Sequence, residues 1–580
     1  MNTNPILDKL PKHLKALISE QDYASYTEQD HAIWRYVMRR NIAYLPKFAH
    51  SAYLDGLKKT GLETERIPGI DEMNEILKEI GWAAVSVDGF IPPNAFMEFQ
   101  AHNVLVIATD IRSIDQVEYT PSPDILHEAA GHAPIIADPE YANYLKRFGE
   151  IGAKAFTSGY DFELYEAIRH LSILKADPHT PEEDILEAKR DLENLSKSKP
   201  APSEMERIRN LHWWTVEYGL IGTIDNYKLY GAGLLSSVGE SESCQKPEVK
   251  KLPYNLDTQN QSFDITTKQP QLFVTPNFQH LEKVLDEFAN SIGLRKGGEY
   301  AIAKAIDSRN LATLVWSSGL QVSGKFTEAI QNKGKTIYLK TLGKTNLNYD
   351  GKQLNGHSGK YHKEGFGAPI GKLKGTPKAI EDHHFQELKE MGISPNNRVA
   401  LEFESGIVVT GKVKTVLVKQ KPILITFENC KVTYGSQTLF EPSWGTYDMA
   451  IGTSIASGFA GAADPDSYGT LIPIPKEKVH KIKHSTREKE LHFLYGKVRE
   501  IRETKSDLKP LEAIFEKLRS NHPQDWLLPL EIYELIHGEK SMSSSSKKVL
   551  NHLQKLGEEN SQFCNAIEAG LSILKSLPNE

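Results

Sequence analysis

Cysteine is scarce in this chain of 580 residues, which contains only three. Cys244, Cys430 and Cys564 lie far apart, so they predict neither a disulfide framework nor a cysteine-built zinc site. Apolar runs long enough to cross a membrane are absent, and the first residues lack the basic and apolar regions of a signal peptide. The net charge of −7 is spread over a long chain and indicates no particular partner. We therefore expect a cytoplasmic protein that does not bind a membrane.

The composition changes along the chain and predicts a multidomain α+β protein. Residues 1–320 mix helical periodicity with short β-like runs and should form a mainly α-helical domain with short strands. Residues 321–484 are rich in glycine, lysine and β-branched residues, which favours a β-rich domain, either a barrel or a sandwich. Residues 485–580 show helical periodicity again and are expected to form a C-terminal helical domain. A charged helical insertion at about 155–203 should lie on the surface.

The role of the C-terminal half is left open by the sequence. Residues 331–380 contain ten lysines against two acidic residues, but such charge alone is non-specific, and we expect a solvated surface rather than a nucleic-acid site. The expected contribution of this half is to assembly, solubility or regulation, and an oligomer contact or a protein partner is among the open possibilities. Histidines and lysines after about Ser318 show no ligand-like spacing, so truncation near Gln331 is predicted to leave a folded, active first domain.

Two histidines, His127 and His132, stand five residues apart. Because a regular helix has about 3.6 residues per turn, side chains five apart point about 140° away from each other. Both imidazoles can reach one metal ion only if the helix ends or kinks between them, and Gly131 is the residue that allows this. The zinc peptidase pattern spaces its histidines four apart, so that class is disfavoured. Glu217 is the best candidate for a third ligand, and two histidines with one carboxylate suit non-haem Fe(II).

Three stretches, residues 119–134, 213–219 and 230–237, resemble in this order the motifs of the iron- and pterin-dependent aromatic amino acid hydroxylases. The resemblance covers roughly the first half of the chain and is greatest to members that act on phenylalanine. It implies Fe(II) as the metal, tetrahydrobiopterin or a related tetrahydropterin as the electron donor, and hydroxylation of L-phenylalanine to L-tyrosine with O2.

The same resemblance implies roles for individual residues. The metal ligands are His127, His132 and Glu217, and Glu128 is a catalytic residue that faces the pterin and the open metal positions. The pterin stacks on Phe96, with Ile91 in the same wall. A guanidinium suits the substrate carboxylate because it binds bidentately. The implied substrate site comprises Arg112 with Thr120 and Ser236 for the carboxylate, Asp124 to orient the arginine, and Pro123, Trp213, Tyr218, Gly233 and Val274 around the substrate.

Structural roles are the alternatives for three of these residues: Glu128 as a helix-start carboxylate, Phe96 in the core, and Arg112 in a salt bridge. Three alternatives also stay open for the whole chain. It could hydroxylate tryptophan or another ring position, or be a catalytically dead metal-binding interaction protein. A zinc hydrolase with Glu128 as base is the last alternative.

Overall fold

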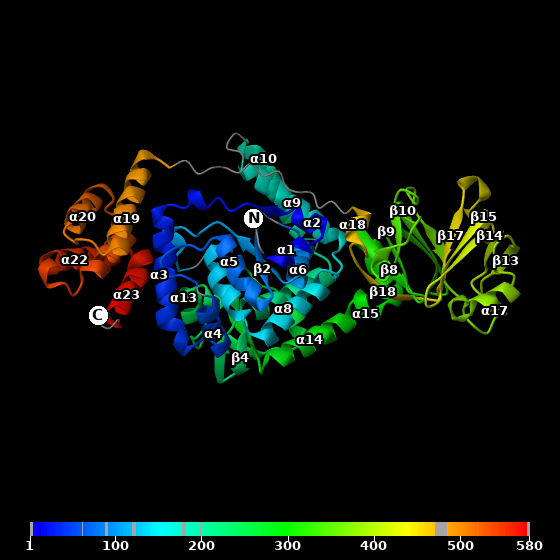
Figure 1. The fold of residues 1–580 in the computed structure, drawn as a ribbon, viewed down its shortest axis with the longest axis horizontal. Coiled ribbons are helices and arrows are strands. Elements are labelled where there is room, and N and C mark those ends of the chain that lie inside the picture. Colours follow the sequence, from blue (N-terminus) through cyan, green and yellow to red (C-terminus); the bar gives the residue numbers. More distant parts are fainter. Residues whose placement is uncertain are drawn as a thin grey trace.

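The computed structural model describes residues 4–60, 62–87, 91–118, 123–176, 181–197, 199–265, 267–469 and 484–576. The helical first part occupies the middle of the molecule, with the β-rich part at one end and the C-terminal helices at the other (Figure 1). Among the described residues, no helix combines the length and the apolar character needed to span a membrane.

The first part packs helices around two small sheets. In one sheet β1 (Ile18–Ser19) runs antiparallel to β2 (Ala83–Val87), which pairs in parallel with β3 (Val104–Ala108). The other has the order β5-β4-β7-β6 and consists of β4 (Leu220–Thr223), β5 (Asn226–Leu229), β6 (Lys250–Pro253) and β7 (Gln271–Thr275). The principal helices are α3 (Glu28–Tyr44), α4 (Ser51–Thr60), α5 (Ile70–Leu77), α6 (Pro93–Ala101), α8 (Pro139–Gly152), α11 (Glu204–His212) and α14 (Phe278–Ser291).

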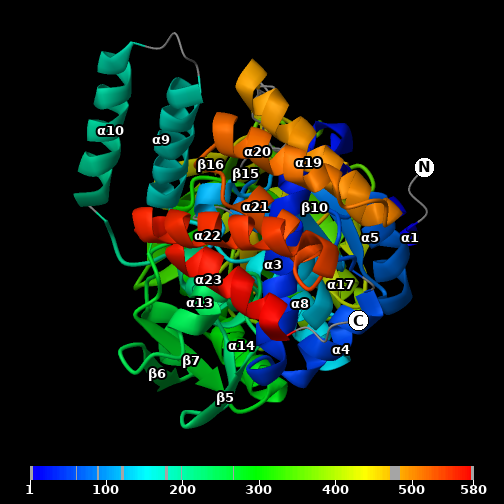
Figure 2. The same ribbon diagram turned by 90° about the vertical axis from the view of Figure 1, so that its left-hand side faces the viewer.

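The predicted insertion forms a helical hairpin of α9 (Gly159–Ala176) and α10 (Glu182–Lys197). The hairpin stands away from the rest of the molecule in Figure 2, and Phe162, Ile168 and Leu186 are exposed on it. It therefore lengthens the chain between the segments that carry the predicted ligands His132 and Glu217, without entering the space between those segments.

The β-rich part contains two bent antiparallel sheets, each with its own apolar cluster. The first has the order β11-β10-β9-β8-β18, with β12 on β10; the second has the order β13-β14-β15-β16, with β17 on β15. The first sheet consists of β8 (Leu311–Trp316), β9 (Leu320–Asn332), β10 (Lys335–Tyr349), β11 (Lys352–Gln353), β12 (Gly367–Pro369) and β18 (Ile455–Ala460). The second consists of β13 (Arg398–Glu402), β14 (Ile407–Val418), β15 (Pro422–Tyr434), β16 (Gln437–Phe440) and β17 (Tyr447–Ala450).

The first sheet begins ahead of the boundary predicted at 320/321. β8 pairs with both β9 and β18, and α16 (Gly298–Asp307) contributes Ala301, Ile302 and Ala305 to the same apolar cluster. Truncation near Gln331 would cut β9 just before its end and remove every other strand of the sheet except β8.

The C-terminal helices share one continuous apolar core with the first part. They are α19 (Thr486–Thr504), α20 (Pro510–Asn521), α21 (Leu527–Ile536), α22 (Ser543–Glu559) and α23 (Ser561–Ser576). They lie over α3, as Figure 2 shows. The ring of Trp526 packs edge-on against Tyr36 of α3 at a centroid distance of 5.1 Å, and the Tyr36 hydroxyl donates to the carbonyl of Ala566. The C-terminal helices therefore complete the core of the first part.

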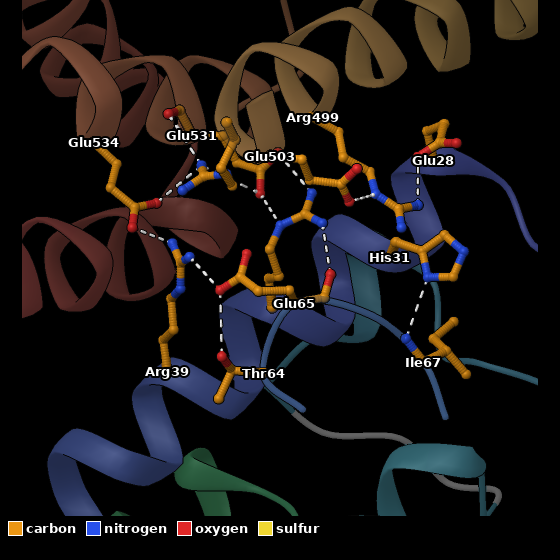
Figure 3. Close-up of polar contacts among 12 residues, drawn as sticks. Glu28, His31, Arg39, Thr64, Glu65, Ile67, Arg499, Glu503, Glu531 and Glu534 are labelled. Atoms are coloured by element: carbon orange, nitrogen blue, oxygen red, sulfur yellow. Dashed lines mark hydrogen bonds and ion pairs between the residues drawn. The ribbon is translucent and has the colours of Figure 1, made fainter. Parts of the chain in front are cut away.

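Ion pairs tie the same surfaces together (Figure 3). The buried Arg35 on α3 donates from Nε and a terminal nitrogen to both carboxylate oxygens of Glu531 on α21, at 2.6 and 3.0 Å. Arg39 pairs with Glu534, and Arg499 on α19 pairs with Glu28. A buried bidentate pair of this kind fixes the register of two elements, because either charge alone would be left desolvated.

His31 makes this interface sensitive to acid. Its Nδ1 accepts a hydrogen bond from the backbone N–H of Ile67 at 3.2 Å, which requires a neutral ring (Figure 3). Burial, and then the charge of Arg499, lowers the pKa of His31 from 6.5 to about 4. The unfolded chain therefore binds the proton first as the pH falls, and stability present above pH 6.5 is lost as the pH approaches 4.

The unfolding free energy of the wild type should fall as the pH is lowered from 7.5 to 4.5. In His31→Gln this fall should be smaller by on the order of 2–3 kcal/mol. Denaturant titrations at several pH values measure this difference. His384→Gln, which changes an exposed histidine of the β-rich part, is the matched control. An unchanged pH dependence in His31→Gln would contradict the assignment.

Candidate active site

The predicted ligands lie on two π-helices, η5 (His127–His132) and η6 (Trp213–Glu217). A π-helix bonds residues five apart, as in the hydrogen bond from the Ala133 N–H to the Glu128 carbonyl. This wider turn returns His127 and His132 to the same side. The predicted end or kink at Gly131 was therefore wrong, because the backbone passes through this glycine with helical hydrogen bonding.

Gly131 is required for a different reason. A Cβ atom at this position would lie 2.7 Å from the carbonyl oxygen of Ala232, on α12 (Ala232–Leu235). The absence of a side chain lets α12 pass close to η5 and brings Ser236, at the end of α12, beside His127. The Ser236 hydroxyl lies 3.1 Å from Nδ1 of His127, which leaves Nε2 of that ring directed at the other ligands.

The three predicted ligands converge. Nε2 of His127 lies 3.0 Å from Nε2 of His132 and 3.1 Å from a carboxylate oxygen of Glu217, and the other Glu217 oxygen lies 3.4 Å from Nε2 of His132. Adjacent ligands of a six-coordinate ion with bonds of about 2.1 Å lie about 3.0 Å apart. The spacing and the N,N,O donor set therefore fit one face of an octahedral divalent ion.

Two further ionisable groups surround this triad. Oε2 of Glu128 lies 3.9 Å from Nε2 of His132, and burial raises the pKa of Glu128 to about 8. Nδ1 of His212 lies 3.6 Å from Glu217, and burial lowers the pKa of His212 to about 4. Burial opposes ionisation of Glu217, but attraction to His132 and His127 outweighs it and holds the Glu217 pKa well below its usual range.

Arg112 and Asp124 form a buried bidentate pair next to the triad. Nε and a terminal nitrogen of Arg112 donate to the two oxygens of Asp124 at 2.8 and 2.9 Å, and the other terminal nitrogen donates to the Ser236 carbonyl at 3.3 Å. Asp124 also accepts from the backbone N–H of His127 at 3.0 Å. A guanidinium has five N–H donors, and within the described ranges no residue accepts from the remaining two, one on each terminal nitrogen.

A cavity of ≈610 Å³ joins these groups. The ring of Trp213 stacks on Phe263 at 4.2 Å and lies 4.8 Å from the ring of Tyr218, which fixes one wall. Phe96 meets His212 edge-on at 5.7 Å on the other side. The predicted residues that line the cavity are Ile91, Phe96, Arg112, Pro123, His127, Glu128, His132, Trp213, Glu217, Tyr218, Gly233 and Ser236.

Three predicted residues are not among those that line the cavity; one of them is Asp124, which contacts Arg112. Val274 is buried in β7 and is not among the lining residues, so its predicted contact with substrate is not reproduced. Thr120 lies outside the described residues. Sequence reasoning missed Arg209, Glu240 and Phe263, which also line the cavity. Only Arg209 had a usable signal, because it stands one helical turn before His212.

The first half of the chain is similar to one family of known proteins. A family model described as biopterin-dependent aromatic amino acid hydroxylase matches residues 19–157 and 149–302. The phenylalanine-4-hydroxylase of Pseudomonas aeruginosa is 28% identical over 272 residues, which are 46% of this chain and 86% of that protein. That of Dictyostelium discoideum is 30% identical over 274 residues, 46% of this chain and 52% of that protein. An iron- and phenylalanine-bound structure of the Chromobacterium violaceum enzyme aligns with 48% of this chain and 87% of its own, with 25% identity and a TM-score of 0.36.

Proposed function

We propose that this chain, which belongs through residues 19–302 to the biopterin-dependent aromatic amino acid hydroxylase family, hydroxylates L-phenylalanine to L-tyrosine with O2. The observation that carries the proposal is the convergence of His127, His132 and Glu217 beside a cavity with a guanidinium at its wall. The relatives named phenylalanine-4-hydroxylase support the choice of ring and position.

The ligand set suits Fe(II), because two imidazoles and one carboxylate leave one face of the ion open. When bound, iron and the tetrahydropterin supply the electrons and activate O2, which is chemistry that no side chain can perform. The protein positions both: the π-helices hold the three ligands in place, Phe96 presents a ring for the pterin to stack on, and Glu128 lies within 3.9 Å of a ligand atom. A carboxyl group with a raised pKa at that point can donate a hydrogen bond to a polar group of the pterin.

Two sets of contacts orient the substrate, one to its carboxylate and one to its ring. The two N–H donors of Arg112 that no described residue accepts match a carboxylate in bidentate geometry, while Asp124 prevents the guanidinium from rotating. The ring of phenylalanine then lies against the fixed aromatic wall of Trp213 and Tyr218, which excludes water from the reacting carbon. Phe263 stacks on Trp213 and lines the same cavity, so these two rings and that of Tyr218 form one continuous aromatic wall.

The test is turnover of the full chain with Fe(II), a tetrahydropterin and O2, supplied in turn with phenylalanine, tyrosine and tryptophan. Tyrosine formed from phenylalanine, with one pterin oxidised per product, is the expected result. Faster hydroxylation of tryptophan would show that tryptophan, and not phenylalanine, is the substrate. Absence of hydroxylation in iron-loaded protein would favour the alternative that the chain is a catalytically dead metal-binding interaction protein.

Arg112→Lys is expected to raise the KM for phenylalanine by at least tenfold. A single ammonium cannot reproduce the bidentate fork, and a charge-assisted hydrogen bond contributes roughly 1.5–3 kcal/mol. Initial rates over a range of phenylalanine concentrations measure the effect. Arg147→Lys, in a surface ion pair on α8, is the control and should leave the KM unchanged. A normal KM in Arg112→Lys would remove this residue from the substrate site.

A further inference from the structure

A second cluster of metal-ligand side chains lies in the β-rich part, far along the chain from the triad. It consists of His357, His362 and Asp448 and is called the His357 cluster below. Nδ1 of His357 lies 3.4 Å from Nε2 of His362, and both nitrogens lie 3.7 Å from Oδ2 of Asp448. The two histidines are again five residues apart, so the expectation that no histidine after Ser318 has ligand-like spacing was wrong.

The backbone fixes the two histidines in place. They lie in the segment between β11 and β12, and this segment is held along β10. The carbonyl of His357 accepts from the N–H of Leu347, and the carbonyl of His362 accepts from the N–H of Thr345. Gly359, between them, passes so close to β10 that a Cβ atom there would lie 2.3 Å from a side-chain carbon of Lys344. Both imidazoles are thus positioned by the first sheet of the β-rich part.

Asp448 comes from the other sheet, on β17. Its Oδ1 accepts a hydrogen bond of 2.6 Å from the Thr426 hydroxyl on the adjacent strand β15, which orients the carboxylate. Its Oδ2 points at the two histidines, is shielded from solvent and accepts no hydrogen bond of normal geometry within the described part of the chain, although the Tyr361 hydroxyl also lies beside this carboxylate. An orphaned carboxylate oxygen in a buried site is costly, and a bound cation is one way to satisfy it.

The spacing distinguishes this site from the triad. The ligand atoms are separated by 3.4, 3.7 and 3.7 Å, whereas those of the triad are separated by 3.0, 3.1 and 3.4 Å. Ligands of a tetrahedral zinc ion, with bonds of about 2.0–2.1 Å, lie about 3.3 Å apart. The wider set fits a tetrahedral ion better than an octahedral one. His357 retains 16% side-chain exposure, so the fourth position can be reached by water.

We propose that the His357 cluster is a second metal site, which binds Zn²⁺ through Nδ1 of His357, Nε2 of His362 and Oδ2 of Asp448, with water as the fourth ligand. The Thr426 hydroxyl is the outer-shell partner that orients the carboxylate. Because the histidines lie in a segment held against one sheet and the aspartate lies in the other sheet, the ion would join the two sheets. Its binding free energy therefore adds to the stability of the β-rich part.

The test counts zinc in the full chain after removal of metal by a chelator and dialysis against Zn²⁺. Wild-type protein should hold two ions, one at each site. The double variant His127→Ala/His132→Ala should hold one, Asp448→Asn should hold one, and the triple combination should hold none. His384→Gln is the matched control and should hold two. Zinc should also raise the unfolding temperature of the double variant but not of the triple variant.

Asp448→Asn keeps the size of the side chain and the contact with Thr426, and the ion retained at the catalytic triad shows that the chain is folded. If Asp448→Asn loses both ions, the same measurement is made on His357→Gln, which changes the partly exposed ligand. The proposal is overturned if the double variant binds no zinc, or if Asp448→Asn and His357→Gln bind as much as wild type. One ion left in the triple variant would place the zinc elsewhere and also overturn it.

Discussion

Glu217→Ala is expected to yield a folded protein that holds no iron at the triad and forms no hydroxylated amino acid. The carboxylate supplies the only anionic ligand, and its loss leaves two neutral imidazoles that cannot hold Fe(II) on one face. Because a catalytic metal contributes several kcal/mol to lowering the barrier, the rate should fall by at least about a thousandfold. Iron content by mass spectrometry and tyrosine formation from phenylalanine measure the two effects.

Glu248→Ala is the control, since this glutamate is exposed and belongs to the same part of the chain. It should retain iron and activity. Glu217→Ala should still unfold cooperatively, but with a lower unfolding free energy than the iron-free wild type, because the buried carboxylate is paired with the histidines around it. Stoichiometric iron retained in a well-folded Glu217→Ala protein would show that the ligand set is wrong.

Deleting residues 485–580 is expected to unfold or aggregate the first part of the chain, although no predicted ligand is removed. The deletion uncovers Tyr36 of α3, which packs against Trp526, and removes from the shared core the apolar side chains of the C-terminal helices, among them Leu494, Leu527 and Leu553. Burial of apolar side chains of this size contributes about 1.5–3 kcal/mol each, comparable with the whole stability of a domain when several are lost. Circular dichroism and thermal unfolding measure the outcome.

Glu531→Ala tests the same interface in the full chain. It leaves the Arg35 guanidinium buried without its carboxylate, which should cost about 3–5 kcal/mol of unfolding free energy. Glu558→Ala, at an exposed position on α22, should cost less than about 0.5 kcal/mol. If the shortened chain folds and hydroxylates normally, the C-terminal helices are an accessory, as the sequence first suggested.

The parts of the site that lie close together in the sequence were predictable. The spacing of His127 and His132 indicated a shared ligand role, Glu217 was the best candidate for the third ligand, and the resemblance supplied Arg112. The π-helices were not predicted, because no residue type signals the backbone hydrogen bonds between residues five apart that define them. His357 and His362 have the same spacing, but Asp448, the third member of their cluster, lies on a different sheet and is brought near only by the fold.

Helical periodicity correctly predicted the amphipathic helices after Ser485 but not the surface that they cover. Leu494 and Val498 showed that one face of α19 is buried, and the same pattern would suit a self-contained bundle. The contact with α3 depends on Glu531 meeting Arg35, residues separated by 496 positions. A single sequence contains no signal for a pairing at that distance, so the domain division at 485 could not reveal the shared core.

The separation between Arg35 and Glu531 also sets an order of events during synthesis. α3 leaves the ribosome before its covering helices, because Glu531 is synthesised 496 positions after Arg35. At about 5–20 residues per second, the apolar face of α3 waits roughly 25–100 s for its partner. Over this interval the surface of α3 that receives these helices stays uncovered, so the core that they share with the first part cannot be completed before the C-terminal helices have been made.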